Sequence, residues 1–106
     1  MDKLGIVKNV EAFGDTYDLV VYKGEYQNGG IAIDIRCLEN GYEEPYAVLS
    51  VNLPEVSHAL DKNEFFVKLW SENNHLHKPM IESGLFIDTG RFAVGGYVDA
   101  PIWKLA

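Results

Sequence analysis

The chain has 106 residues, 47% of them apolar, and a formal net charge of −7 from 16 acidic and 9 basic residues. This length fits a single domain with one core, residues 1–106, and the negative charge disfavours direct binding to nucleic-acid phosphates. The sequence contains no apolar run of membrane length and begins without the apolar stretch of a signal peptide. We therefore expect a cytoplasmic protein.

The first half of the chain predicts four strands in which apolar and polar residues alternate. They span residues 4–13, which are irregular, and residues 16–23, 31–38 and 45–53. The turns between them contain Gly14-Asp15, Asn28-Gly29-Gly30 and Asn40-Gly41, and these residues tolerate the backbone of a tight hairpin. Because the links are short, we expect each strand to pair antiparallel with its predecessor, as in a meander.

Cys37 is the only cysteine, so no disulfide can form within the chain, and a reducing compartment is the simple inference. The residue continues an alternating run of Ile31, Ile33 and Ile35. We interpret Cys37 as a small core residue and not as a nucleophile.

The second half of the chain predicts shorter strands. Pro54 ends the preceding strand because it has no N–H to donate. Residues 65–70 are bulky on both faces, which is typical of a strand that is central or covered by a helix. Residues 55–63 predict a loop with one helical turn at 56–60. Two strands follow at 85–87 and 91–94, around Asp88-Thr89-Gly90. A turn at Gly95-Gly96 then leads to a closing strand at 97–105.

Residues 74–83 are the only segment that predicts a helix of several turns. Leu76, Met80 and Ile81 give it a narrow apolar stripe, and Gly84 fits a left-handed residue that ends it. A helix this short is not stable alone, so its order must come from packing on the sheet.

Pro79 leaves two starting points for this helix. A start at Asn74, a good N-cap, places Pro79 beyond the first turn, where it removes a needed hydrogen bond. A start at Lys78 puts Pro79 at the first helical position, where it is tolerated, but leaves barely one turn. We favour residues 74–83 with a distorted first turn.

Together these elements predict an α+β fold. We expect one antiparallel meander sheet of about five to seven strands, strongly twisted, with one short helix packed on one face. The second face of this sheet would carry the apolar residues Val20, Tyr22, Val48, Phe66 and Trp70. A second copy of the chain could cover that face, which predicts a homodimer as an alternative function.

The sequence shows no constellation of catalytic residues, and we expect a protein that is not an enzyme. His75 and His77 are two residues apart, which points them to different sides of a helix, so we expect no metal site there or with His58. The glycine pairs open strands and not helices, so we expect no phosphate-binding loop and no cofactor. A small enzyme with two carboxylates that meet across the sheet remains the third reading.

Acidic and aromatic residues cluster at one predicted hairpin. Tyr42 and Tyr46 flank Glu43 and Glu44, and we expect them to form an exposed patch that suits a protein interface. The full set of candidate protein-binding residues is Glu25, Asp34, Glu39, Tyr42, Glu43, Glu44 and Tyr46.

Four stretches in residues 30–105 carry a family resemblance: AIDIRCLENGYEEPYAVLSVNLP, NEFFVKLWSEN, ESGLF and DTGR. They resemble a family of small proteins with a "domain of unknown function" that is common on bacterial phages and plasmids. His75, His77 and Pro79 depart from the helix formers expected in such a chain. The resemblance assigns no catalytic residue.

What the resemblance implies is a genetic context. Such genes lie among accessory genes of mobile elements, and some small acidic proteins of that class block host defence systems such as CRISPR nucleases. Our first hypothesis is therefore a non-enzymatic, acidic protein-binding module of a mobile element. It would inhibit a host defence nuclease, as anti-CRISPR proteins do, by occupying its basic nucleic-acid-binding surface.

Overall fold

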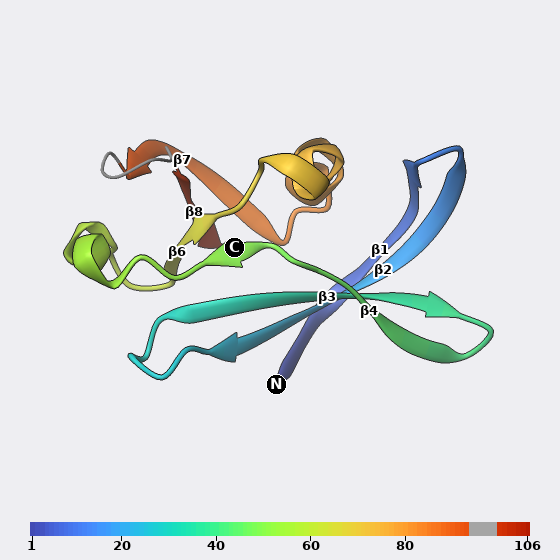
Figure 1. The fold of residues 1–106 in the computed structure, drawn as a ribbon, viewed down its shortest axis with the longest axis horizontal. Helices are drawn as coiled ribbons and strands as arrows, with labels where there is room; N and C mark the ends of the chain where they lie inside the picture. Colours follow the sequence, from blue (N-terminus) through green and yellow to red (C-terminus); the bar gives the residue numbers. More distant parts are fainter. Residues whose placement is uncertain (94–99) are drawn as a thin grey trace.

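A computed structural model describes residues 1–93 and 100–106, which form two four-stranded antiparallel sheets and three short helical segments (Figure 1). The first sheet has the order β1-β2-β3-β4, with strands Asp2–Ala12, Asp15–Glu25, Ile31–Glu39 and Tyr42–Val48. The second has the order β5-β6-β8-β7, with strands Ser50–Val51, Glu64–Val67, Ala100–Leu105 and Phe86–Ala93 in that order. The predicted α+β class with antiparallel pairing is confirmed, but the prediction of one sheet with five to seven strands is wrong.

The first sheet is the predicted meander. Its β3–β4 hairpin turns at Asn40 and Gly41, whose φ angles are 53° and 81°. Positive φ at both central residues is typical of the type I′ turn, whose twist matches that of the flanking strands. The β1–β2 hairpin turns at Phe13 and Gly14, one residue before the predicted position. β1 is irregular as expected, because its pairing with β2 shifts twice, once between Lys3 and Gly5 and again between Val7 and Val10.

The chain passes from one sheet to the other at Leu49, within the segment predicted as a single strand. The Leu49 N–H donates to the Ile33 carbonyl of the first sheet (2.9 Å), and the Leu49 carbonyl accepts from the Lys68 N–H, which follows β6 (2.6 Å). Ser50 then enters the second sheet, while its Oγ accepts a hydrogen bond from the Ile33 N–H (2.9 Å). One buried residue therefore joins the backbones of both sheets.

The second sheet has β6 and β8 at its centre, as the bulky faces of residues 65–70 indicated, but β6 ends at Val67, so the predicted strand positions 68–70 are wrong. β7 is one continuous strand, so the predicted break at Asp88-Thr89-Gly90 is wrong. These residues form a bulge in which Gly90 has a φ of 78° and Thr89 Oγ1 donates to the Ile102 carbonyl (2.6 Å). The predicted turn at Gly95-Gly96 and the strand positions 94 and 97–99 lie outside the described residues.

The helix differs from the prediction at its start. A 3₁₀ segment, η2 (Ser71–Leu76), leads into a short α-helix, α1 (His77–Glu82), and Asn74 does not act as its N-cap. Pro79 thus falls in the first turn of α1, where its missing N–H is not needed. The predicted end is confirmed, because Gly84 has a φ of 79° and donates to the Ile81 carbonyl.

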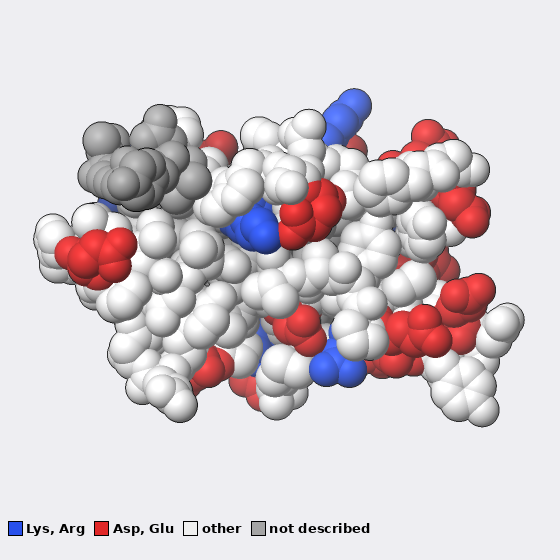
Figure 2. All heavy atoms as spheres, in the orientation of Figure 1, with Lys and Arg blue, Asp and Glu red and all other residues white. Residues whose placement is uncertain are grey.

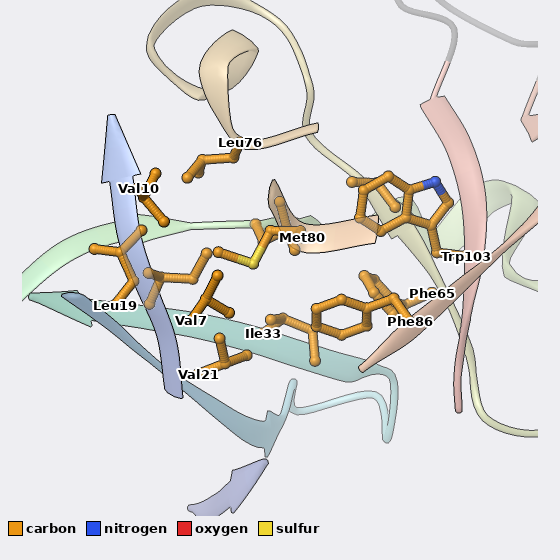
Figure 3. Close-up of a cluster of buried hydrophobic side chains, with 13 residues drawn as sticks. Val7, Val10, Leu19, Val21, Ile33, Phe65, Leu76, Met80, Phe86 and Trp103 are labelled. Atoms are coloured by element: carbon orange, nitrogen blue, oxygen red, sulfur yellow. The ribbon is translucent and has the colours of Figure 1, made fainter. Parts of the chain in front are cut away.

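One hydrophobic cluster fills the space between the two sheets and α1 (Figure 3). Met80 of α1 lies between the valines of the first sheet and the aromatic residues of the second in this view. The buried members are Val7, Val10, Leu19, Val21, Ile33, Ile35, Leu49, Phe65, Val67, Leu76, Met80, Phe86 and Trp103. Cys37 packs against their margin and is half-buried, so its interpretation as a core residue is confirmed only in part.

A smaller cluster covers the outer face of the second sheet. Phe66 and Ile102 are buried there against residues of and around η1 (Pro54–Ala59), a 3₁₀ segment in the predicted loop, including Val56 and Leu60. Among the described residues, none of the helices is both long enough and apolar enough to cross a membrane.

Candidate functional site: an acidic end of the first sheet

Two hairpin turns lie at the same end of the first sheet. Asp18 of β2 pairs with Leu38 of β3, so the start of β2 lies beside the end of β3. The turn before β2 and the turn after β3 therefore project from one end, on the right of Figure 1. We call residues 9–18 and 37–46, which surround these two turns, the acidic end.

The acidic end contains six carboxylates and neither lysine nor arginine. The first range holds Glu11, Asp15 and Asp18, and the second holds Glu39, Glu43 and Glu44. Figure 2 shows carboxylates gathered at this end of the visible face, while lysine and arginine lie over other parts of the molecule. Lys8 and Arg36 border the two ranges. Within the ranges the carboxylates have no cation, so their charges give the end a negative potential that attracts a basic surface.

The carboxylates of both hairpins act on a shared space. An open groove of about 580 Å³ is lined by Asp15 and Asp18 of β2 and by Cys37 and Glu39 of β3, among others. The pKa of the Cys37 thiol is raised, first by burial and then by the charges of Glu39, Glu44, Asp18 and Asp15. A group in this groove therefore experiences the charges of the two hairpins together.

Each of the two turns also exposes an aromatic ring. Phe13 is 79% exposed in the first turn, and Tyr42 is 76% exposed beside the second. Aromatic side chains surrounded by polar groups are common anchors of protein interfaces. The acidic end thus combines charge with two apolar contact points.

Four of the predicted protein-binding residues, Glu39, Tyr42, Glu43 and Glu44, lie at this end. Glu43 is fixed there by the Tyr22 hydroxyl, which donates to its Oε1 (2.6 Å). This hydrogen bond is also the main reason that the pKa of Tyr22 is raised.

Tyr46 does not join Tyr42 in an exposed patch, which corrects the prediction. Arg36 pairs with Pro45 and Ile35 with Ala47, so Tyr46 is the extra residue of a bulge. Its side chain packs against the core cluster, and its hydroxyl shares a hydrogen bond with His75 Nε2 (2.7 Å). Regular alternation, on which the prediction depended, does not hold across such a bulge.

Glu25 and Asp34 lie outside the acidic end. Glu25 pairs with Ile31 at the opposite end of the sheet, and Asp34 lies in mid-strand, where it accepts a hydrogen bond from Arg36 Nε (3.1 Å). The sequence reasoning missed Phe13 and the three carboxylates of the first hairpin. A signal was present, because the first and third turns of any meander lie at the same end of the sheet.

Glu64 is the one described carboxylate that is buried. Its surroundings are relevant to the third hypothesis, a small enzyme with two catalytic carboxylates. Burial alone would raise its pKa, but hydrogen bonds from Arg91 and from the Asp61 N–H outweigh that effect and lower the pKa. Such a carboxylate stays ionised at neutral pH, unlike a general acid. Its contacts tie the loop before β6 to β7, and the same Arg91 Nη2 also lies 3.9 Å from the Asp61 carboxylate.

His75 and His77 have separate contacts. His75 contacts Tyr46 and Phe13, whereas His77 lies beside the Trp103 ring, with a centroid distance of 5.7 Å. Within residues 1–93 and 100–106, no three His, Cys, Asp or Glu side chains are placed to hold a metal ion.

Comparison with known proteins agrees with the resemblance to an uncharacterised domain. No curated protein and no solved structure matches the chain. One family model, described as "Domain of unknown function (DUF4313)", matches residues 16–105, from the start of β2 to the end of β8. Because this match covers most of the sequence, the chain belongs to the DUF4313 family.

Proposed function

We propose that this protein is a non-enzymatic binding module that docks its acidic end on a basic protein surface. The observation that carries the proposal is the gathering of six carboxylates and the exposed Tyr42 at one end, in two ranges that contain no cation. Charge complementarity of this kind speeds encounter and selects partners.

The partner that we propose is the nucleic-acid-binding surface of a host defence nuclease in the bacterial cytoplasm. Such a surface carries lysine and arginine to bind phosphates, and carboxylates on two projecting hairpins are complementary to it. The protein would then inhibit the nuclease by occupying that surface, as an anti-CRISPR protein does. The family resemblance to accessory proteins of phages and plasmids supports this context.

The strand edges favour docking through side chains over strand addition. Among the described strands, β1, β4 and β7 are edge strands with register shifts, and β4 also contains Pro45. β5, the remaining edge, has only two residues. Interrupted or very short edges are poor templates for another strand, so the side chains of the hairpins are the better contact.

Neutralising the acidic end tests the proposal. In purified nucleases that the protein inhibits, we expect the triple variant Glu39→Gln, Glu43→Gln, Glu44→Gln to weaken inhibition by roughly 10- to 100-fold. The matched control changes three exposed carboxylates elsewhere, Glu25→Gln, Glu55→Gln and Glu82→Gln, and alters the net charge equally. The measurement is the inhibition constant at low and at physiological salt.

Two results would contradict docking through the acidic end. One is an equal loss of inhibition in both triple variants, since only net charge would then matter. The other is an inhibition constant that does not weaken as salt rises, because contacts between exposed charges are screened.

As a second function, we propose self-association through the outer face of the first sheet. Ile6 and Val48 are 40% and 50% exposed on this face, whereas Val20 on the same face is only 1% exposed and Tyr22 is half-buried. Phe66 and Trp70, predicted to share the face, lie instead in the cluster under η1. We expect light scattering at dilute concentration to give the mass of a dimer, and Val48→Asp to halve it; a wild-type monomer would refute this function.

A further inference from the structure

We propose that Phe13 is the apolar anchor of the acidic end and that it inserts into an apolar pocket rimmed by lysine or arginine on a protein partner. This inference rests on the proposed docking function and names the residue and the pocket chemistry that it would use.

The backbone of Phe13 is the first observation. Five described non-glycine residues have positive φ: Asn9, Phe13, Asn40, Asn63 and Ser71. Phe13, with a φ of 54°, is the only one of them with a large side chain. Asparagine adopts this conformation at low cost, whereas a bulky side chain is strained there.

The exposure of Phe13 is the second observation. At 79% it is the most exposed of the large hydrophobic side chains in the described part of the chain. Burial therefore does not compensate for the strained backbone. The comparable turn of the other hairpin uses Asn40-Gly41, the favoured pair for this geometry, so the fold itself does not require phenylalanine. Strain without burial points to a role in binding.

The ring of Phe13 is nevertheless held in place. It packs against the His75 ring in a T-shaped arrangement, with a centroid distance of 5.1 Å, and His75 Nε2 is hydrogen-bonded to the Tyr46 hydroxyl (2.7 Å). Tyr46 in turn packs against Tyr17 of β2, at 5.5 Å between centroids. An exposed ring fixed in this way loses little conformational freedom on binding, which is what an anchor requires.

The residues around Phe13 define the pocket that would receive it. Glu11 and Asp15 flank it in sequence, and both are exposed. An apolar ring with an exposed carboxylate on either side of it in sequence is complementary to an apolar pocket whose rim is basic. A partner with an acidic or uncharged rim would leave these carboxylates without a counter-charge.

The test can be made before the partner is identified. The probe is a random peptide library displayed on phage and selected on the wild-type protein. We expect enriched peptides that combine apolar residues with lysine or arginine, and that bind Phe13→Asn at least about tenfold more weakly. The matched control is Phe92→Asn, which alters an exposed phenylalanine of β7 and should keep the affinity. We expect Phe13→Asn to melt at or above the temperature of the wild type, since it removes the strain.

Each other outcome counts against the inference in a distinct way. If Phe13→Asn melts several degrees lower, the ring serves to fasten the hairpin to η2, and the anchor role is overturned. If basic, salt-sensitive peptides bind Phe13→Asn equally well, the anchor fails while docking by the acidic end stands. If the selected peptides lack basic residues, or none are enriched, both the basic rim and the proposed docking function are overturned.

Discussion

Asn73→Asp is expected to lower the free energy of unfolding by about 3–5 kcal/mol, because it removes two buried hydrogen bonds and places a charge beside their acceptors. Asn73 is fully buried in η2, and its Nδ2 donates to the Val48 carbonyl (2.8 Å) and to the Lys68 carbonyl (3.0 Å). These two carbonyls lie on either side of the passage between the sheets. Aspartate has no N–H to offer them and would bring a negative charge against both oxygens.

The neighbouring residue supplies the control for this experiment. Asn74 is exposed, so Asn74→Asp makes the same chemical change without burial and should alter stability by less than about 0.5 kcal/mol. Urea unfolding at neutral pH gives both values. Equal losses in the two variants would mean that charge alone, and not the buried amide, causes the effect.

Met80→Ala is the second large effect that we expect, with a loss of about 2–5 kcal/mol. Met80 is fully buried and is the residue of α1 that lies between the two sheets in Figure 3. Its removal leaves a cavity in the main cluster. Because α1 has only six residues, it depends on this packing for its order.

Lys78→Ala is the matched control for Met80→Ala. It makes a change to alanine on the exposed face of the same helix, and alanine favours the helix in both variants. We expect Lys78→Ala to stay close to the wild type in urea unfolding. A loss for Met80→Ala below about 1 kcal/mol would show that the site collapses around the missing side chain.

The parts of the fold that could be predicted are those determined by residues that are close together in the sequence. Asn40-Gly41 specifies its hairpin locally, and Leu76 and Met80 form an apolar stripe at helical spacing. The passage at Leu49 was not predictable in this way. Apolar and polar residues continue to alternate through it, so the pattern of one long strand and that of two strands in different sheets are the same.

About half of the candidate site could be predicted, for a similar reason. Glu39, Glu43 and Glu44 are close in sequence, so their clustering needs no tertiary information. Phe13 joins them only through the pairing of β2 with β3. Tyr46 was placed on the wrong face because the bulge after Pro45 has no mark in the sequence beyond the proline itself.

The passage at Leu49 also governs how the molecule would respond to a load. Leu49 is hydrogen-bonded to Ile33 on one side and to Lys68 on the other, so the passage between the two sheets is fastened to both of them. A force applied at the tips of the hairpins would be transmitted along β3 and β4 to Leu49, and from there to β6. We therefore expect the two sheets to move as one rigid body when the protein binds a partner.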